Sequence, residues 1–434
     1  MKSAQPKVLH PVTGRSLIEH VLATAAALKP QNTGVVVGVG RQQVQQTLQN
    51  KGWKKLTFIV QDQPRGSGHA VLKARNWLRH KKGTLLVLYG DTPLLTPETL
   101  QHLIETHAGS GHAASFLAMD LPDPAGYGRM ILDGNGGLER IIEYRDANET
   151  ERQVTLVNSG VACWDIPRLL EVLPELRPDN AKHEYYLTDA VALLRAREHS
   201  VGVVTATDPT ETHGVNDRND LADVEAISRR RILQRWMQEG VTVVDPATTY
   251  VDANVVLQPD TRLWPGTILQ GSCRIGPRCE IGPYTLIESS VAKAGARIGP
   301  FAHVRPGSVI EAGAHIGNFV EVKKSRIGKG SKANHLSYLG DARVGDRVNV
   351  GAGTITCNYD GVAKHATMIA DDVFIGSNAN LVAPVRIGRG AMIAAGSTIT
   401  DPVPPDSLAV ARTPQVVKRR WVKAWLRTRK RGAR

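Results

Sequence analysis

The chain has 434 residues, a length that fits two or three domains. Its content of 41% hydrophobic and 22% charged residues excludes a disordered or fibrous protein, and 41 glycines beside only 5% aromatic residues favour a fold rich in tight turns. The net charge of +13 is concentrated near the end, because residues 418–434 hold nine Lys or Arg and no acidic residue.

No targeting or membrane signal is expected. No apolar run approaches the roughly 18 residues needed to cross a bilayer, and residues 1–7 lack the hydrophobic stretch of a secretory signal. The cysteines show neither a CxxC motif nor zinc-ligand spacing, which favours buried or bystander thiols over disulfides (Cys163, Cys273, Cys279 and Cys357). These features predict a cytoplasmic protein.

The first half alternates strand-like and helix-like segments. Residues 33–40 and 84–89 are short, nearly all-apolar runs, as expected of parallel strands that are covered on both faces. Residues 16–28 and 70–79 carry helical patterns. We therefore predict an α/β domain with right-handed crossovers over residues 1–217.

A change of pattern follows this domain. Apolar residues recur at helical spacing from Leu221 to Trp236 in a charged segment, which predicts a linker helix over residues 218–240. From Val251 onward, an aliphatic residue recurs at every sixth position, often followed by a small residue as in Ile275-Gly276. This spacing is too sparse for a helix face and too long for strand alternation.

A period of six instead suits a triangular coil with one short strand for each hexapeptide. We expect a parallel β-helix domain over residues 241–410, with repeats from about 250 to 405. Three loops are expected to interrupt it, near residues 288–297, 323–343 and 356–368.

A basic tail is expected over residues 411–434. It can be a solvated, frayed end, or it can contact a nucleic acid or a membrane surface, and Trp421 and Trp425 add amphipathic character. Nothing else in the sequence points to nucleic-acid recognition.

Two features of the first half suit phosphate chemistry. Asp91 comes directly after a predicted strand, where a carboxylate can bind Mg²⁺, although it can also cap the following turn. Gly66-Ser67-Gly68 precedes a helix and can bring backbone N–H groups close to an anion or a base edge.

Taken together and in order, the motifs of both halves closely resemble a known family from residue 1 to about 415. They resemble the bacterial bifunctional N-acetylglucosamine-1-phosphate uridyltransferases/glucosamine-1-phosphate acetyltransferases. The motifs that carry the resemblance are Pro6-Lys7-Val8-Leu9, Gly126-Tyr127-Gly128-Arg129, Asn158-Ser159-Gly160, Gly214-Val215-Asn216, Arg305-Pro306-Gly307, Asn318-Phe319-Val320-Glu321, His335-Leu336-Ser337-Tyr338 and Gly351-Ala352-Gly353-Thr354.

The resemblance implies a fold and a first set of roles. The implied fold is a Rossmann-like nucleotidyltransferase domain followed by a left-handed parallel β-helix, and the resemblance also implies a homotrimer. Asp91 and Asn216 would bind Mg²⁺, Lys7 would bind phosphate, and the uracil of UTP would be recognised by Gln61, Gly66 and Ser67. The N-acetylglucosamine group would be held by Tyr89, Gly90, Gly128, Glu143 and Asn158.

For the β-helix, the resemblance implies acetyl transfer from acetyl-CoA. His335 would be the general base, although a loop histidine by itself is more often structural. Arg305 and Lys323 would bind the sugar phosphate, and Tyr338 and Asn349 its hydroxyls. The residues along acetyl-CoA would be Ala352, Asn358, Tyr359, Ser377, Ala395 and Arg412, of which Asn358 and Tyr359 can also simply close a turn.

One family motif is missing. The family's opening strand and its loop Leu-x-Ala-Gly-x-Gly-Thr-Arg-Met do not occur, and Met1 falls where the last Met of that loop stands. Either the natural chain starts further upstream, or the uridyltransferase is crippled while the acetyltransferase is intact.

We therefore expect a bifunctional enzyme that makes UDP-N-acetylglucosamine for cell-envelope precursors. The alternative is an acetyltransferase whose first half is a scaffold. A third hypothesis is a binding protein that uses the basic tail. The expected partners are small-molecule substrates and two further copies of the chain, with no nucleic acid and no stable membrane association.

Overall fold

The structure, a computed structural model, describes residues 1–124 and 126–431, with only the backbone described at residues 430 and 431. The chain forms two compact units, and the second begins at Arg230, inside helix α9 (Arg218–Gln238). The last three residues of the expected basic tail lie outside the described residues.

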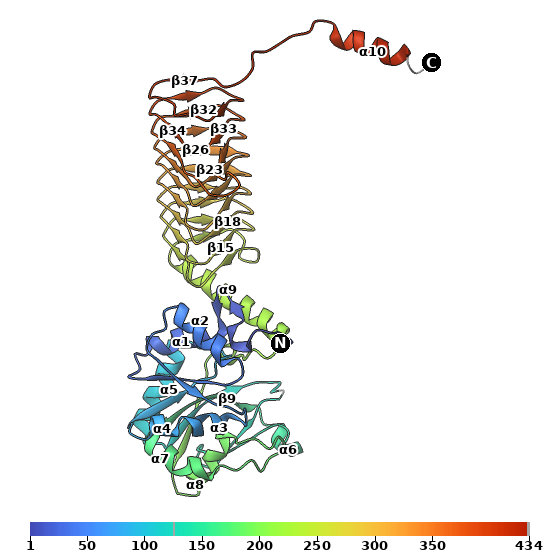
Figure 1. Cartoon of the computed structure of the whole chain (residues 1–434). Helices are drawn as coiled ribbons and strands as arrows, with labels where there is room; N and C mark the ends of the chain where they lie inside the picture. Colours follow the sequence, from blue (N-terminus) through green and yellow to red (C-terminus); the bar gives the residue numbers. More distant parts are fainter. Residues whose placement is uncertain (125, 432–434) are drawn as a thin grey trace. The chain divides into compact units, whose positions relative to one another are not determined.

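The first unit is an α/β layered domain, which confirms the predicted class (Figure 1). A mixed sheet runs in the order β10-β6-β9-β7-β8, and β5 also pairs with β9, whereas β3 and β4 form a separate parallel pair. The strands are β1 (Pro11–Val12), β2 (Arg15–Ser16), β3 (Thr33–Val37), β4 (Leu56–Val60), β5 (Thr84–Val87), β6 (Ala114–Asp120), β7 (Arg129–Leu132), β8 (Leu138–Ile142), β9 (Leu156–Asp165) and β10 (Val201–Thr205).

Local sequence signals explain where the helices begin. Helix α1 starts after Ser16, whose side chain forms a reciprocal capping box with Glu19, and α5 starts after Thr96, whose hydroxyl accepts a hydrogen bond from the Thr99 N–H. The helices of this unit are α1 (Leu17–Ala27), α2 (Arg41–Asn50), α3 (Ser67–Lys73), α4 (Arg75–Leu78), α5 (Pro97–Ser110), α6 (Glu149–Arg152), α7 (Ile166–Val172) and α8 (Ala190–Arg195).

The prediction for residues 84–89 is wrong in one respect. Strand β5 is not a parallel strand covered on both faces: its partner is the antiparallel β9, and none of its four residues is fully buried. Within the described residues, β3 and β5 each have only one paired edge. An apolar run predicts that a strand packs against other elements, but it does not predict whether the neighbouring strand is parallel or antiparallel. That neighbour is a segment about 75 residues away in the chain.

The second unit contains the predicted parallel β-helix, whose short strands stack into three parallel sheets (Figure 1). The first sheet contains β11 (Thr242–Val243), β14 (Arg262–Leu263), β17 (Glu280–Ile281), β20 (Arg297–Ile298), β23 (His315–Asn318), β26 (Lys332–His335), β29 (Asn349–Val350), β32 (Phe374–Ile375), β35 (Met392–Ile393) and β37 (Leu408–Ala409). The second contains β12 (Tyr250–Val251), β15 (Ile268–Gln270), β18 (Leu286–Glu288), β21 (His303–Val304), β24 (Glu321–Lys323), β27 (Tyr338–Gly340), β30 (Ile355–Cys357), β33 (Asn380–Val382) and β36 (Thr398–Ile399). The third contains β13 (Val256–Leu257), β16 (Arg274–Ile275), β19 (Val291–Ala292), β22 (Val309–Ile310), β25 (Arg326–Ile327), β28 (Ala342–Val344), β31 (Thr367–Ile369) and β34 (Val385–Ile387).

The period of six works because its aliphatic residues fill the axis of the coil. Leu263, Ile281 and Ile316 are 0% exposed and belong to one continuous core. Buried hydroxyls close the corners: the Thr261 hydroxyl donates to the Gly276 carbonyl and that of Ser331 to the Gly345 carbonyl. Such bonds satisfy buried carbonyl groups between successive coils.

Two of the three expected loops are absent, which corrects the prediction. Residues 288–297 and 323–343 form continuous coils with strands β19, β20 and β25–β28. In these stretches the inward positions are five residues apart instead of six, as between Ile287 and Ala292, because a corner is one residue shorter. A missing corner residue shifts the register of the sequence pattern without interrupting the stack. A loop does interrupt the repeats between β30 and β31, where residues 358–366 are inserted.

Candidate functional site

Three of the predicted uridyltransferase residues lie together in the first unit. The Lys7 ammonium donates to Asp91 Oδ2 at 2.5 Å and to Asn216 Oδ1 at 3.3 Å. The backbone explains the proximity of the two oxygen donors, because the Val215 N–H donates to the Asp91 carbonyl at 2.9 Å. Asp91 follows strand β5 and Asn216 precedes α9, so two distant segments converge on one cation.

This donor set fits Mg²⁺. A carboxylate and an amide oxygen converge on a positive charge, and Mg²⁺ is commonly bound by one or two carboxylates together with substrate phosphates rather than by a cage of protein ligands. The described part of the chain contains no group of three or more His, Cys, Asp or Glu that could hold a metal ion.

A second group of predicted residues surrounds Tyr89. Burial raises the pKa of Tyr89, nearby Ser67 opposes this shift, and the negative charges of Glu143 and Asp91 add to it. Tyr89 as a whole is 37% exposed. Burial also raises the pKa of Glu143. The structure thus places Ser67, Glu143 and Asp91 near Tyr89.

Glycines allow this group to pack. The ring of Tyr89 lies where a Cβ on Gly160 would stand, 2.5 Å from Tyr89 Cε2, and Gly160 has a φ of +84°. Gly128 faces the carboxylate of Glu143, which would be 3.4 Å from a Cβ there. Asn158 joins them, because its N–H donates to the Gly128 carbonyl and its side-chain oxygen accepts from the Gly160 N–H, both at 2.9 Å.

Further carboxylates lie near this group. Burial, followed by the negative charge of Asp146, raises the pKa of Asp189 to about 6. Burial, followed by the charge of Glu143, also raises the pKa of Tyr186 to about 12. Several carboxylates therefore lie close together near the predicted sugar site.

Gln61 and Gly66 lie at the ends of one loop. The Gln61 amide donates to the Gly66 carbonyl at 3.2 Å and contacts His69 Nδ1 at 3.0 Å. Gly66 has a φ of +102°, and a Cβ there would lie 2.5 Å from the Tyr185 carbonyl oxygen. Gly90 similarly leaves room for Val8, which would be 3.4 Å from a Cβ.

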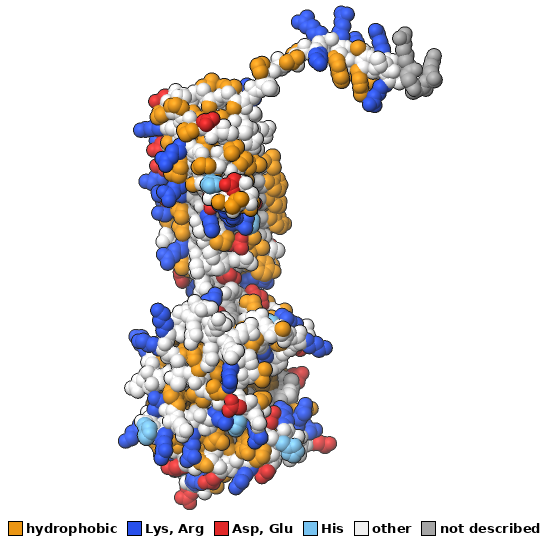
Figure 2. Space-filling model, in the orientation of Figure 1, with side chains coloured by type: hydrophobic (Ala, Val, Ile, Leu, Met, Phe, Trp, Pro, Cys, Tyr) orange, Lys and Arg blue, Asp and Glu red, His pale blue; other side chains and the backbone are white. Residues whose placement is uncertain are grey.

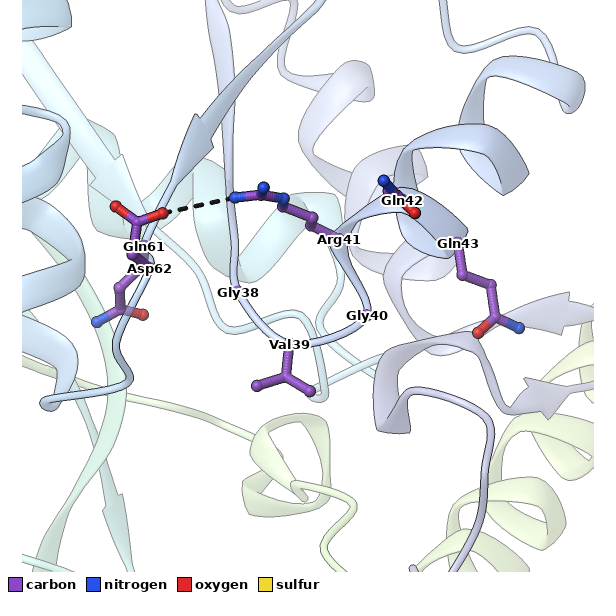
Figure 3. A pocket seen from close by; sticks show the side chains of 8 residues that line it. All are labelled: Gly38, Val39, Gly40, Arg41, Gln42, Gln43, Gln61 and Asp62. Atoms are coloured by element: carbon purple, nitrogen blue, oxygen red, sulfur yellow. Dashed lines mark hydrogen bonds and ion pairs between the residues drawn. The ribbon is translucent and has the colours of Figure 1, made fainter.

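Gln61 also lines a hollow of about 410 Å³ (Figure 3). The turn between β3 and α2 forms the other wall, and Arg41 reaches across to Asp62 at 3.5 Å. The hollow lies at the carboxyl ends of the parallel strands β3 and β4, where open α/β sheets bind ligands. Its lining residues are Gly38, Val39, Gly40, Arg41, Gln42, Gln43, Gln61 and Asp62.

In the second unit, His335 is held by a residue that the sequence analysis did not assign. Its ring Nδ1 lies 2.7 Å from Asn318 Oδ1, and the two residues are register partners on β26 and β23. An amide oxygen only accepts hydrogen bonds, so this contact is a hydrogen bond when Nδ1 carries the hydrogen, which leaves the lone pair of Nε2 free. This is the tautomer that a general base needs.

Three of the residues predicted for acetyl-CoA form a column with His335. The registers Ala333↔Val350, Val350↔Ile375 and Ile375↔Ile393 align the coils. Two positions further along each coil stand the four aligned residues His335, Ala352, Ser377 and Ala395. Backbone bonds from Asn378 to Ala352 and from Gly396 to Ser377 hold this edge. Three small side chains after a histidine leave a strip along which an extended ligand can lie.

A cationic group lies on the neighbouring sheet. Arg305 donates to Glu321 at 2.8 Å, and this bond raises the pKa of Arg305. The neighbouring Lys364 ammonium lowers the pKa of Lys323, with Arg305 adding to the effect. Two adjacent ammonium groups that repel each other form a natural site for an anion such as a sugar phosphate.

The remaining predicted residues are distributed around this group. Asn358 contacts the Tyr338 hydroxyl at 3.4 Å and Asp341 Oδ2 at 2.5 Å, so it joins Tyr338 rather than the small-residue column. Tyr359 is 59% exposed in the inserted loop, where its hydroxyl donates to Gly361. Asn349 lies in register with Lys332 on the sheet of His335, and Arg412 is exposed beyond β37.

Two functional candidates thus escaped the sequence analysis, Asn318 and Lys364. Asn318 lies 17 residues before His335, which is the length of one shortened coil, so the register of the repeats could have paired them. Lys364 lies in the inserted loop, where no period indicates its neighbours.

Within the described residues, no helix is long and apolar enough to cross a membrane. Two families match parts of the chain: the MobA-like NTP transferase domain matches residues 1–146, and six repeats of the bacterial transferase hexapeptide match residues 366–401.

Curated relatives match nearly the whole chain. The bifunctional protein GlmU of Shouchella clausii is 45% identical over 98% of this chain and 96% of its own length. That of a Geobacillus strain (WCH70) is 46% identical over 97% and 95%, and that of Prochlorococcus marinus is 45% identical over 97% of both. The nucleotidyltransferase unit, the hexapeptide β-helix and these full-length matches together show that the chain belongs to the GlmU family of bifunctional transferases.

Proposed function

We propose that this chain acetylates glucosamine 1-phosphate with acetyl-CoA and then transfers UMP from UTP to N-acetylglucosamine 1-phosphate, which yields UDP-N-acetylglucosamine and pyrophosphate. The observation that carries the proposal is the presence of two separate clusters in two units. Lys7, Asp91 and Asn216 form one, and His335 with its Asn318 partner forms the other.

For acetyl transfer, His335 Nε2 removes a proton from the amine of glucosamine 1-phosphate while the amine nitrogen attacks the thioester carbonyl. A C–N bond forms, the C–S bond breaks, and the imidazolium returns its proton to the leaving thiolate of CoA. Asn318 Oδ1 keeps the ring in position and accepts a stronger hydrogen bond once the ring is charged. The cations of Arg305, Lys323 and Lys364 hold the sugar phosphate.

For uridylyl transfer, a phosphate oxygen of N-acetylglucosamine 1-phosphate attacks the α-phosphorus of UTP, and the bond to pyrophosphate breaks. Asp91 and Asn216 would hold Mg²⁺, which offsets phosphate charge when bound. Lys7 supplies a further positive charge to the phosphates. Tyr89, Glu143 and Asn158 orient the sugar, and Gln61 with the Gly66-Ser67 turn faces the base.

The test is a pair of assays on the full chain, one with acetyl-CoA and glucosamine 1-phosphate, the other with UTP, Mg²⁺ and N-acetylglucosamine 1-phosphate. We expect both activities, loss of acetyl transfer alone in His335→Ala, and loss of uridylyl transfer alone in Asp91→Ala. Acetyl transfer without uridylyl transfer would overturn the second activity and leave an acetyltransferase with a scaffold domain. Near-normal acetylation by His335→Ala would remove that residue from the mechanism.

We also propose that the β-helix assembles into a homotrimer. Support comes from a column of exposed apolar side chains on successive coils, in which Tyr284, Phe301 and Phe319 stack with ring centroids 5.3 and 5.4 Å apart. These three residues are 63%, 47% and 57% exposed, and a contiguous exposed apolar patch is typical of protein interfaces. Light scattering should give about three times the chain mass of 47.1 kDa, reduced in the double variant Phe301→Ser/Phe319→Ser. A monomeric wild-type chain would refute the trimer.

A further inference from the structure

The loop inserted at residues 358–366 carries Lys364, and its side chains mostly face solvent. Residues 359–364 are all exposed, and Val362 at the tip of the loop is 92% exposed. A loop with this exposure gains little stability from the burial of apolar surface. Polar contacts therefore decide its conformation.

The backbone of the loop folds back on itself as a narrow hairpin. Tyr359 and Lys364 form an antiparallel bridge. Next to this bridge, the His365 N–H donates to the Asn358 carbonyl at 2.8 Å. Lys364 thus lies on the returning arm of the hairpin, directly before the residue whose backbone closes the base.

The base of the hairpin is attached to the coil that follows Lys323. The side chain of Asn358, which is buried, donates to Asp341 Oδ2 at 2.5 Å. The Asp341 N–H in turn donates to the Lys323 carbonyl at 2.9 Å. These two bonds place the hairpin beside Lys323, one of the residues predicted to bind the sugar phosphate.

Asp360 connects the tip of the hairpin to its returning arm. Its Oδ1 accepts hydrogen bonds from the N–H groups of Val362 and Ala363, at 2.8 and 2.7 Å. Its Oδ2 lies 2.7 Å from His365 Nε2, and because a carboxylate only accepts hydrogen bonds, this contact is a hydrogen bond when Nε2 carries the hydrogen. The backbone bonds, followed by His365, hold the pKa of Asp360 well below its usual range.

The closed hairpin keeps two like charges together. The Lys364 ammonium lowers the pKa of Lys323, and the charge of Arg305 adds to the effect. Figure 2 shows several basic side chains on the visible face of the β-helix, with histidine and acidic side chains among them. Like charges repel, so without a phosphate the free loop would favour positions that move Lys364 away from Lys323. A contact next to Lys364 is needed to oppose this movement.

We propose that His365 and Asp360 are positioning residues for acetyl transfer, whose hydrogen bond holds Lys364 beside Lys323 so that the sugar phosphate meets a preformed pair of cations. This inference rests on the proposed acetyltransferase function and deepens it. Because the loop is ordered before the substrate arrives, less conformational entropy is lost on binding. His365 and Asp360 act through Lys364, and the chemical step stays at His335.

Hydrogen exchange of the full chain tests the hairpin without any substrate, through peptides that span residues 358–366. His365→Phe keeps a ring but removes the hydrogen bond, and it should speed exchange of this segment at least about fivefold. His365→Gln, whose side-chain amide can donate to the same carboxylate, should restore protection to within about twofold of wild type. Val362→Thr changes the exposed tip and is the matched control, which should exchange like wild type.

Kinetics with saturating acetyl-CoA test whether the hairpin acts through Lys364. His365→Phe should raise KM for glucosamine 1-phosphate about 5- to 20-fold and leave kcat within about threefold, and His365→Gln should restore KM. Lys364→Met should raise KM at least about tenfold. Adding His365→Phe to Lys364→Met should then change KM by less than about twofold, because residues that act through one ammonium group are not additive.

Three results would overturn the proposal. The first is unchanged exchange in His365→Phe, which would mean that the backbone bonds to Asp360 hold the hairpin by themselves. The second is an effect of His365→Phe on kcat instead of KM, and the third is a full effect on KM in the Lys364→Met background. Failure of the proposed function differs from all three: the wild-type chain would not acetylate glucosamine 1-phosphate, although exchange in His365→Phe would still be faster, and His365 would have no role in acetyl transfer.

Discussion

The hydrogen bond between Asn318 and His335 predicts that Asn318 positions the general base for acetyl transfer. Its length is 2.7 Å, and it joins a neutral amide to a ring that becomes charged during the reaction. A hydrogen bond to a charged group contributes about 1.5–3 kcal/mol. Removing the acceptor in Asn318→Ala should therefore lower kcat for acetyl transfer about 10- to 150-fold. KM for glucosamine 1-phosphate should stay nearly constant, because Asn318 holds the base rather than the substrate.

A second variant separates positioning from simple structural damage. In Asn318→Asp a carboxylate replaces the amide and favours the protonated ring, so a higher pH is needed to free Nε2. Unit charges about 4 Å apart interact by about 1 kcal/mol in bulk water and by more near a protein surface, so the effect is at least about 0.7 pH units. The acidic limb of the kcat/KM profile should move upward by at least that amount.

The matched control is Asn380→Asp, the same chemical change on another coil of the β-helix, which should leave the profile in place. The pH dependence of initial rates with acetyl-CoA in excess measures both effects. A kcat within twofold of wild type for Asn318→Ala, together with an unmoved profile for Asn318→Asp, would refute the positioning role.

Three further predictions concern the first unit. Asp91→Asn should lower uridylyl transfer at least about a hundredfold and raise the Mg²⁺ concentration needed for half-maximal rate, because one charged ligand is lost; an unchanged Mg²⁺ dependence would contradict the assignment, and acetyl transfer serves as the internal control. Gly160→Ala should destabilise this unit by at least about 1–2 kcal/mol, which is the cost of the left-handed backbone alone, and the added methyl group would also clash with the Tyr89 ring. Thermal melting measures the loss of stability. Gly134→Ala is the control that should melt like wild type, because no atom lies within 4 Å of a Cβ at that position. Burial raises the pKa of Asp189 from 3.8 to about 6 in the folded chain, so its charged form opposes folding increasingly between about pH 4 and 6 and constantly above. Asp189→Asn should therefore stabilise the chain by about 1 kcal/mol at pH 7.5, after allowance for its partial exposure, and by nothing below pH 4; equal effects in urea titrations at both pH values would show that the charge is not the cause.

Both architectures could be predicted from the sequence because their signals are local. An inward aliphatic residue at every sixth position is a property of consecutive residues, and each hexapeptide needs only its neighbours to form a coil. The same holds for α1, where Ser16 and Glu19 mark the start of the helix. The order of the motifs also predicted roles for Asp91 and Asn216 in uridylyl transfer and for His335 in acetyl transfer.

Errors arose where a local pattern was extended to a non-local property. The two absent loops were inferred from a broken period, whereas a corner shortened by one residue shifts the period and preserves the stack. Strand β5 was expected to be parallel because apolar runs are typical of parallel strands, yet its partner β9 is antiparallel. Neither corner length nor partner direction is encoded in the residues of the strand itself.

The sequence by itself determined the α/β unit, the hexapeptide β-helix and most of the residues suited to phosphate and acetyl chemistry. Only the tertiary structure decided which of them meet: Lys7 with Asp91 and Asn216, Asn318 with His335, and Lys364 with Lys323. The physical reason is that hydrophobic periodicity acts between neighbours along the chain, while a hydrogen bond or a repulsion between ammonium groups depends on side chains brought together from 17 to 209 residues apart.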